Sequence, residues 1–486
     1  MAVRRNYLLP TLIFTCSLLF FLLWPAPIDE KSDWPAIHRP TAHQQENSYL
    51  TPDSTIIYRT FLDYRAQQAA VRILAFRQCV RNESLRMKIE VYLRNGTMIS
   101  LRPTVKPVEA ECPWHWAPSC DWSGHVISAF LPKDQAKAMI SASLINWESL
   151  LPLSQLNIVQ PSKAPQKAQL AICILPLYWY TDWLQLVQFF EIWKLQGASR
   201  VFVYYHSISE TVDKWLVAYE KEGLVKRIPW TLLPKNSRVD PNLSIYRLGH
   251  SLAENDCVYR TMGVAKFVAL VDFDEFIIPT SGTLLQYLQS ALKKNPSAGS
   301  FRFPHFRLAF GGQRPTGKLA AGDVHFNWLL KAKKVVSDAR SGPSKTVFLP
   351  DRTDVLLTHQ VRAHLAGYSQ VAVDANEAML LHARANWQQT ASADNGSSAT
   401  AIRKIFGESL RNAVLMQFRR IFAKYFGRNA KLEQNDGVRK EVAMCLSDWK
   451  GVGCKTPYHS CYARVHNMTN WVFSIPERHS GNYLVL

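Results

Sequence analysis

The sequence predicts an α/β protein in which a mostly parallel, Rossmann-like sheet forms the main domain. A small β-rich domain precedes it, and a single transmembrane helix stands at the amino terminus. Strand and helix patterns alternate from residue 168 onward, which indicates a sheet wound from βα units. Short β-branched runs dominate residues 56–161, as is typical of a β domain. Residues 8–24 carry no charge and are just long enough to span a bilayer.

Length and composition fit several globular domains. The 486 residues exceed what one hydrophobic core usually serves, and 47% hydrophobic residues suffice for packed interiors. The formal net charge is +19, but lysine and arginine are spread along the chain without a basic arm or a nucleic-acid-binding motif. We therefore expect no nucleic-acid partner, since a basic surface equally suits an enzyme that attracts an anionic substrate.

The amino terminus predicts a membrane anchor. Arg4 and Arg5 precede the uncharged stretch at residues 8–24, and no positive charge follows it immediately. This asymmetry places residues 1–7 in the cytosol and the rest of the chain in the lumen, as in a type II signal anchor. A cleavable signal peptide is the alternative, but the segment after the stretch is a poor cleavage site. The polar, proline-containing residues 25–55 are expected to form a stem.

Cysteines and glycosylation sequons favour a lumenal body. Of the nine cysteines, Cys16 lies in the uncharged stretch and eight follow it, an even number that fits an oxidising compartment and up to four disulfides. Zinc binding is the rival interpretation, but the close Cys-x-x-Cys pairs of structural zinc sites are missing. Five Asn-x-Ser/Thr sequons occur, at Asn82, Asn95, Asn242, Asn395 and Asn467.

Residues 56–161 are expected to form the β-rich accessory domain. Asn95-Gly96 predicts a hairpin turn. The tryptophans of residues 114–122 have the chemistry to stack on sugar rings, but packing around the neighbouring cysteines is the favoured interpretation. Strands are predicted at Ala70–Phe76, Met87–Leu93 and Gly124–Phe130.

Residues 168–400 are expected to form the catalytic domain. Helices are predicted at Trp183–Gln196 and Thr211–Glu222, and Gly223 ends the second. Neither a Gly-x-Gly-x-x-Gly fingerprint nor a Walker loop is present, which excludes dinucleotide oxidoreductases and P-loop kinases. Strands alternate with these helices at Ala171–Leu177, Arg200–Tyr205 and Leu224–Ile228.

The acidic run of residues 268–279 is the candidate functional element. It is interpreted as one buried strand, along which Asp272 and Asp274 share a face while Glu275 points to the opposite face and is structural. Two carboxylates at the carboxyl end of a strand suit Mn²⁺ or Mg²⁺, which take carboxylates together with substrate phosphates. An acidic turn after a core strand is the alternative for a lone Asp-x-Asp. We expect a nucleotide to lie on a floor formed by Pro176, Tyr178, Tyr204 and Tyr205.

The carboxyl-terminal residues 401–486 are expected to be helical and to contain cysteines. The apolar positions of Ile402–Phe426 have the spacing of an amphipathic helix, for which packing on the catalytic domain is favoured over contact with a membrane surface. The cysteines from Cys445 to Cys461 are expected to fix the carboxyl-terminal segment by disulfide bonding.

An ordered set of short motifs extends through residues 168–384. It includes Cys173–Tyr178, Trp183-Leu184, Phe190-Glu191, Gly197-Ala198, Tyr204-Tyr205, Tyr219, Gly223, Trp230, Asn255–Cys257, Lys266–Phe276, Lys345–Pro350, Leu357–His359 and Leu381–Arg384. This set resembles glycosyltransferase family 92. One position departs from the family's pattern, because Ala383 stands where the family has a tyrosine.

The resemblance implies a single-pass Golgi membrane protein with a GT-A type catalytic domain. It implies transfer of galactose from UDP-galactose to a glycan or glycoprotein acceptor, with manganese and a β-1,4 linkage. A divalent ion held by Asp272 and Asp274 would act as a Lewis acid on the departing pyrophosphate. His382 is the expected third metal ligand, and Lys345 and Arg384 are expected to hold phosphate oxygens.

Two questions stay open at this point. Inversion at the anomeric carbon needs a carboxylate that takes the proton of the acceptor hydroxyl, and several aspartates follow the metal-binding run. The main alternative function is a non-catalytic lumenal glycan-binding protein on the same scaffold; a metal-dependent phosphatase or nuclease would need more clustered ligands. The candidates for the base are Asp323, Asp338, Asp351, Asp354 and Asp374.

Overall fold

The computed structural model describes residues 47–79, 87–109, 111–115, 117–147, 152–160, 168–334, 343–383, 405–448, 454, 456–475 and 483–486. All of them belong to the second of two compact units, Pro40–Leu486. The predicted cytosolic tail, transmembrane stretch and most of the stem lie outside the described residues, as do Arg384, Asp338 and the sequons at Asn82 and Asn395. Within the described ranges, no helix is long and apolar enough to cross a membrane.

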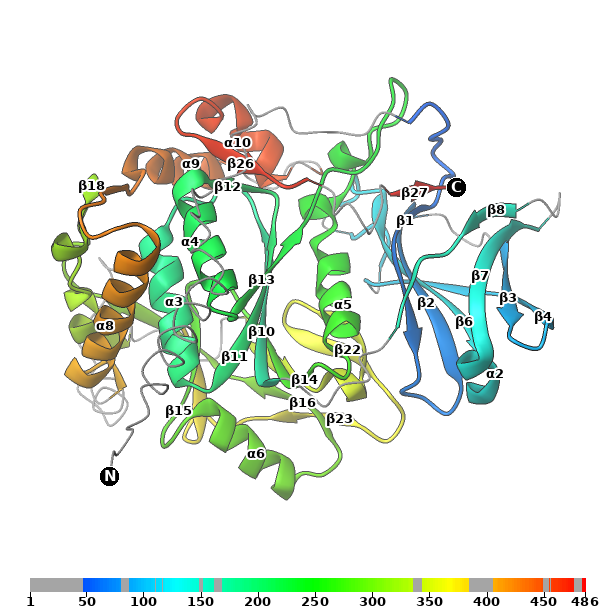
Figure 1. The fold of residues 1–486 in the computed structure, drawn as a ribbon, viewed down its shortest axis with the longest axis horizontal. Helices are drawn as coiled ribbons and strands as arrows, with labels where there is room; N and C mark the ends of the chain where they lie inside the picture. Colours follow the sequence, from blue (N-terminus) through cyan, green and yellow to red (C-terminus); the bar gives the residue numbers. More distant parts are fainter. Residues whose placement is uncertain are drawn as a thin grey trace, which may run out of the picture. The chain divides into compact units, whose positions relative to one another are not determined.

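A seven-stranded mixed sheet forms the centre of the fold (Figure 1). Its first four strands in spatial order are parallel, and β20 pairs antiparallel with both of its neighbours. The predicted α/β class is therefore confirmed. The strand order is β13 (Val225–Pro229), β11 (Ala198–Tyr205), β10 (Ala168–Leu177), β14 (Ala265–Leu270), β20 (Lys345–Phe348), β16 (Ala298–Phe303) and β23 (Ser369–Ala372).

Different layers cover the two faces of this sheet. Along β10, Leu170, Ile172 and Ile174 pack in one hydrophobic cluster with helices α3 and α4, whereas Ala171 and Cys173 pack in another with α5. This alternation follows from the two-residue period of a strand. The bounds are α3 (Trp183–Leu195), α4 (Glu210–Lys221) and α5 (His250–Thr261), with α6 (Leu284–Lys294) following in the chain.

The acidic run is not one strand, contrary to the sequence prediction. β14 ends at Leu270, and the backbone N–H of Glu275 donates to the carbonyl oxygen of Asp272 at 3.0 Å, which closes a turn. The Glu275 carboxylate also accepts a hydrogen bond from the Asp272 backbone N–H at 2.9 Å. The chain then enters a second sheet with the order β15 (Glu275–Pro279), β24 (Ala378–His382), β17 (His305–Phe310) and β19 (Ala332–Lys334).

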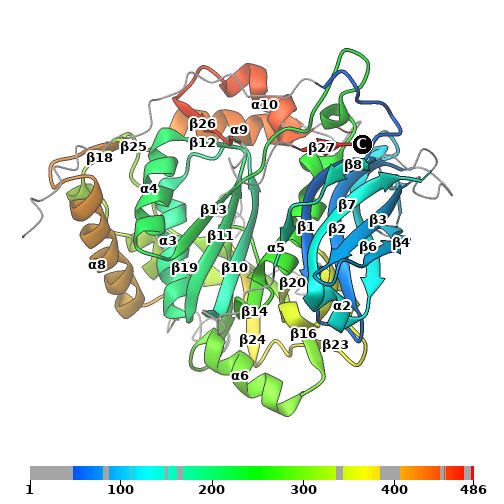
Figure 2. The same ribbon diagram turned by 45° about the vertical axis from the view of Figure 1, so that its right-hand side comes forward.

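The accessory domain consists of two sheets, of which the first lies beside α5 (Figure 2). One contains β27 (Leu484–Val485), β1 (Ile56–Asp63), β2 (Ala69–Gln78), β6 (Trp122–Leu131), β5 (Thr104–Pro107) and β9 (Ile158–Val159). The other contains β4 (Met98–Leu101), β3 (Met87–Leu93), β7 (Met139–Asn146) and β8 (Pro152–Gln155), and α2 (Lys133–Ala138) precedes β7. The carboxyl-terminal strand β27 thus pairs with the first strand of this domain.

Close packing joins the accessory domain to α5. A Cβ atom added to Gly249, which has a φ of +72° just before α5, would lie 2.2 Å from Cε1 of Phe76 in β2. Only glycine tolerates both this backbone conformation and this approach. The sequence pattern alone did not indicate that the two domains share this contact.

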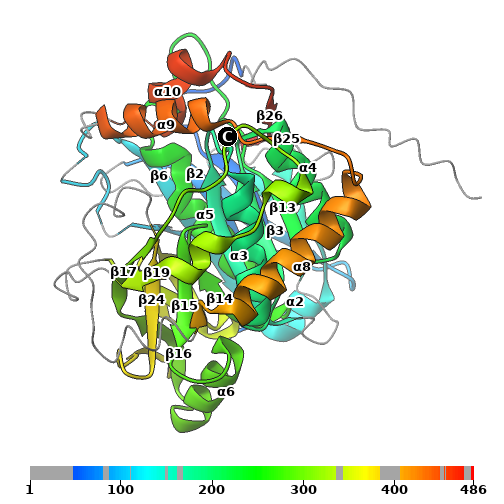
Figure 3. The same cartoon turned by 90° about the vertical axis from the view of Figure 1, so that its left-hand side faces the viewer.

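The carboxyl-terminal helices pack on the catalytic domain (Figure 3). Phe418 of α8 (Glu408–Tyr425) stacks on Trp183 and Trp215, so residues beyond 400 share the core of the main sheet. Helices α9 (Asp436–Asp448) and α10 (Pro457–Val465) follow. The remaining strands form three pairs: β12 (Ser207–Ser209) with β26 (Trp471–Phe473), β18 (Lys318–Leu319) with β25 (Leu432–Glu433), and β21 (Thr353–Leu357) with β22 (Gln360–His364).

All eight predicted lumenal cysteines form disulfides, which confirms the expectation of up to four. The pairs are Cys79–Cys112, Cys120–Cys454, Cys173–Cys257 and Cys445–Cys461. Among the sequons, Asn95 and Asn467 are exposed. Asn242 is fully buried and exchanges hydrogen bonds with the Leu233 backbone, so this sequon is inaccessible in the folded chain.

Candidate functional site

Two pockets meet at the turn between β14 and β15. The first, the strand-end pocket, has a volume of about 280 Å³ and is lined by the end of β10, the start of α5, the turn and Thr358. The second, the α9 pocket, has a volume of about 1160 Å³ and is lined by the segment that leads into α3, the second sheet, residues 312–316 and α9. Both are lined by Tyr178, Tyr180, Gln185 and Asp274.

A buried ion-pair network underlies the turn. The Lys345 ammonium lies 3.0 Å from Asp272 Oδ2 and 3.2 Å from Glu275 Oε2. The side chains of Lys345 and Glu275 are each only 2% exposed. Burial raises the pKa of Glu275 to about 7, against the opposing effect of the Lys345 charge. Desolvation also raises the pKa of Asp272, but the Lys345 ammonium outweighs it and holds this pKa at about 2.

This network corrects two expectations. Glu275 does not face away from the two aspartates predicted to bind metal, because the turn directs its carboxylate to the same lysine that binds Asp272. Lys345 does not line either pocket, and its ammonium is already bound by two carboxylates. The position of Lys345 therefore suits a residue that orients the Asp272 carboxylate, rather than one that binds a phosphate.

His382 lies beside the turn because β24 pairs with β15, which sets His382 opposite Glu275 in the ladder. Its Nε2 is 3.2 Å from Asp274 Oδ2, and its Nδ1 is 3.1 Å from Nε2 of His305. The three predicted metal ligands are thus gathered around one turn. Asp272 is half exposed, and its Oδ1 has no hydrogen bond to any described residue.

The donor set fits a hard divalent ion that takes its other ligands from outside the chain. Among the described residues, no three His, Cys, Asp or Glu side chains form a ready metal cage. Mg²⁺ and Mn²⁺ sites of the substrate-bridged kind need only one or two carboxylates, with phosphate oxygens and water completing the shell. Asp274 and His382 can each supply one ligand atom, and the open Oδ1 of Asp272 can supply a third.

The residues expected to form the nucleotide floor divide into two groups. Pro176 and Tyr178 line the strand-end pocket. Tyr204 is fully buried, and its hydroxyl donates to Asp256 at 2.6 Å; Tyr205 packs in the core of the opposite face. Neither side chain lines either pocket, because each is packed in a hydrophobic core on one face of the main sheet.

Arg247 and His250 also line the strand-end pocket, and sequence reasoning missed both. Arg247 and Leu248 adopt left-handed backbone conformations, with φ of 46° and 50°, which are unusual for residues other than glycine and cluster at functional sites. Tyr178 and Trp230 hold this segment by donating to the carbonyl oxygens of Arg247 and Leu248, at 3.0 and 2.9 Å. No local sequence signal marks such a conformation.

The α9 pocket contains a second charged network. Asp182, the N-cap of α3, accepts hydrogen bonds from Arg314 at 2.8 Å and Arg439 at 3.2 Å. Burial raises the pKa of Asp182, but the guanidinium of Arg314 outweighs it, and the resulting pKa is about 2. The carboxylate is therefore held charged and well hydrogen-bonded.

None of the described base candidates lines either pocket. Asp354 forms an ion pair with Arg72 of the accessory domain at 3.0 Å. Asp182 and Asp274 are the carboxylates that line the α9 pocket. The candidates absent from both linings are Asp323, Asp351, Asp354 and Asp374.

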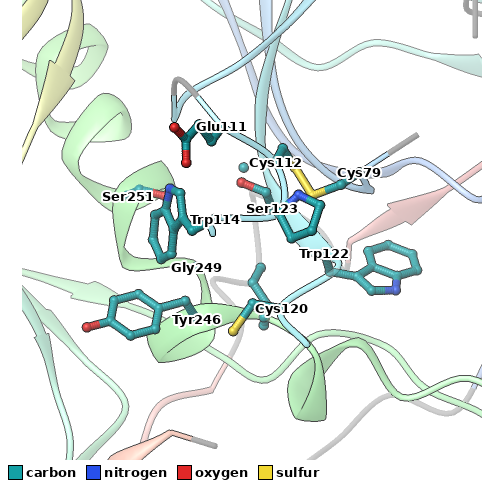
Figure 4. Close-up of a pocket in the computed structure, with 13 residues that line it drawn as sticks. Cys79, Glu111, Cys112, Trp114, Cys120, Trp122, Ser123, Tyr246, Gly249 and Ser251 are labelled. Atoms are coloured by element: carbon teal, nitrogen blue, oxygen red, sulfur yellow. A yellow bond between two sulfur atoms is a disulfide. The ribbon is translucent and has the colours of Figure 1, made fainter. Parts of the chain in front are cut away.

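A third cavity lies between the accessory domain and the start of α5 (Figure 4). Its volume is about 10 Å³, at the lower limit for a single water molecule. Trp114 packs edge-on against Tyr246 beside the Cys79–Cys112 disulfide, with ring centroids 4.9 Å apart. Trp114 and Trp122 therefore pack at the junction of the domains, as favoured over sugar stacking.

Comparison with known proteins agrees with these features. A model of glycosyltransferase family 92 matches residues 168–422. Three Caenorhabditis elegans proteins are similar: glycosyltransferase family 92 protein F13G3.3 (33% identical over 112 residues, 22% of each chain), beta-1,4-galactosyltransferase galt-1 (27% over 151 residues, 30% of this chain and 33% of that protein) and glycosyltransferase family 92 protein F59C6.8 (22% over 343 residues, 68% and 59%).

The matches span between about a fifth and three-fifths of those relatives' lengths. The family model, in contrast, covers more than half of this chain. Its range contains both sheets of the catalytic domain, the acidic turn and His382. The chain therefore belongs to glycosyltransferase family 92.

Proposed function

We propose that this protein is a metal-dependent glycosyltransferase that transfers a hexose from a nucleotide sugar to a hydroxyl of a glycan. The observation that carries the proposal is the turn at Asp272–Asp274, which lies with His382 where two pockets meet. A transferase needs such an arrangement, because donor and acceptor must approach one reacting centre from different sides. The scaffold is assigned as GT-A type.

We infer that the donor is UDP-galactose and that the linkage is β-1,4 with inversion. The similarity to a relative described as a beta-1,4-galactosyltransferase supports this assignment. Four disulfides support a lumenal catalytic domain, and we infer from the predicted type II anchor that this domain lies in the Golgi. The acceptor is assigned to glycans or glycoproteins.

The chain's own groups would prepare the site for this reaction. When bound, a divalent ion supplies Lewis-acid stabilisation of the departing pyrophosphate. Asp274 and His382 would hold this ion, and Lys345 fixes Asp272 beside them. His305 contacts Nδ1 of His382 and so orients the ring whose Nε2 faces Asp274.

The test is a screen of nucleotide sugars with Mn²⁺ against a glycan array, which reports both the donor consumed and the linkage formed. We expect consumption of UDP-galactose. Asp274→Ala should reduce transfer by about a thousandfold, since it removes a group that stabilises charge in the transition state. Asp134→Ala, an exposed carboxylate of α2 outside both pockets, is the matched control and should retain full activity.

Two results would contradict the proposal. The metal assignment fails if folded Asp274→Ala protein transfers hexose as well as the wild type. Glycan binding by the wild type without consumption of any nucleotide sugar would instead support the non-catalytic alternative. Circular dichroism of each variant separates loss of activity from loss of fold.

A further inference from the structure

Helix α9 presents two different faces. Val438 and Cys445 are buried in the hydrophobic core. A second set of side chains recurs at positions i, i+3, i+4, i+7 and i+8, which is one continuous stripe of a helix. This stripe lines the α9 pocket and consists of Arg439, Val442, Ala443, Leu446 and Ser447.

The stripe is fixed in place from both ends of the helix. Asp436 accepts a hydrogen bond from the backbone N–H of Gly317 at 3.0 Å, and Arg439 binds Asp182. Cys445 is joined by a disulfide to Cys461 of α10. A surface held in this way is pre-organised, so a ligand that binds it need not order the helix.

The opposite wall of the α9 pocket belongs to the catalytic domain. Phe310 is half-buried and provides apolar surface, and the half-buried Arg314 provides hydrogen-bonding groups. Phe276, Trp328 and Gln188 also line the pocket but are nearly fully buried, so they support this wall from behind. An apolar ring face beside a guanidinium matches a sugar, which has apolar C–H faces and a rim of hydroxyl groups.

The α9 pocket is also continuous with the proposed reaction centre. It shares Asp274 and Tyr180 with the strand-end pocket and has the larger volume, about 1160 Å³ against about 280 Å³. A ligand in it would therefore reach the turn from the side that α9 lines, whereas the start of α5 lines only the strand-end pocket. That is the approach expected of the hydroxyl that attacks the donor.

We propose that the exposed stripe of α9 forms part of the acceptor-binding site and selects the glycan that is extended. The inference rests on the proposed transferase function. Helix α9 lies beyond the family-matched residues 168–422. The matched segment would thus supply the reaction centre, whereas the carboxyl-terminal segment would supply the wall that decides which acceptor fits.

A pair of charge substitutions on one helix tests this proposal. Leu446 lines the α9 pocket and is 39% exposed, whereas Met444 on the same helix does not line it and is 47% exposed. Leu446→Glu should raise the KM for the glycan acceptor about tenfold or more, because it places an uncompensated carboxylate where a sugar would bind. The KM for UDP-galactose and the melting temperature should stay unchanged. Met444→Glu should leave all three quantities unchanged.

A second variant keeps the test independent of charge. Ala443→Trp fills the α9 pocket from an exposed position of α9 and should also raise the acceptor KM without affecting the donor KM. An unchanged acceptor KM in both folded variants would overturn the inference while leaving the transferase function intact. If the wild type transfers no hexose to any glycan of the array, the proposed function itself fails.

Discussion

The two pockets that meet at the acidic turn hold their charges in different ways. Next to the strand-end pocket, the Lys345 and Glu275 side chains are each 2% exposed and join the two sheets beneath the turn. In the α9 pocket, Arg439 is 36% exposed and Asp182 is 9% exposed, and their ion pair joins the start of α3 to α9. The difference indicates that the proposed reaction centre depends on fully buried charge, whereas the proposed acceptor side depends on a more exposed ion pair.

The largest effect should follow from breaking the buried pair. Lys345→Met leaves the carboxylate of Glu275 without its cation in a water-excluded site. Removing one partner of a buried ion pair costs about 3–5 kcal/mol. We expect a loss of this size in the free energy of unfolding, measured by urea denaturation, together with loss of transfer activity.

Two variants sharpen this comparison. Lys345→Met combined with Glu275→Leu should recover part of the lost stability, because no unpaired buried charge remains. Arg439→Met, at the more exposed pair, should cost only about 1 kcal/mol or less. Equal losses in Lys345→Met and Arg439→Met would show that burial does not distinguish the two networks.

The next effect concerns the disulfide that holds α9. Removing Cys445–Cys461, which closes a loop with a sequence separation of 16, should cost about 3 kcal/mol. Because this bond links α9 to α10, the Cys445→Ser, Cys461→Ser double variant should also raise the acceptor KM while leaving the donor KM unchanged. The measurements are thermal unfolding and steady-state kinetics with each substrate varied in turn.

The accessory domain provides the control for this variant. Removing Cys79–Cys112, with a sequence separation of 33, should lower stability by a similar amount and leave both KM values unchanged. If the two disulfide variants changed the acceptor KM equally, the effect would come from general destabilisation rather than from α9.

Local patterns in the sequence predicted much of the fold. The predicted helices near α3 and α4 end within a few residues of the observed ones, because glycine and capping side chains mark their ends. The acidic run was interpreted as one strand, since its apolar residues on both sides fit a buried strand. A turn that Glu275 closes interrupts this strand. The position of the Glu275 carboxylate depends on Lys345, which lies seventy residues later in the chain.

From the sequence we could predict only those site residues that belong to a short sequence motif. Asp272, Asp274 and His382 were identified from motifs, and the pairing of β15 with β24 gathers them. Arg247 and His250 were missed because a left-handed arginine leaves no pattern in the sequence. The burial of Tyr204 was not anticipated, because its hydrogen-bond partner Asp256 lies 52 residues away in the chain.

A further effect, smaller than those of the buried pair and of the disulfides, is a pH dependence from Asp182. Its pKa is lowered from 3.8 to about 2 in the folded protein, so the folded state favours the charged carboxylate. This stabilisation is present above about pH 4 and is lost as the pH falls toward 2, and it amounts to about 2 kcal/mol. Asp182→Asn should therefore be less stable than the wild type at pH 7, and the difference should shrink between pH 4 and pH 2. Urea denaturation across this range measures it, with Asp63→Asn as the accessory-domain counterpart, since the pKa of Asp63 is also about 2. A difference that stays constant with pH would mean that Asp182 acts through the shape of its hydrogen bonds to Arg314 and Arg439 rather than through its charge.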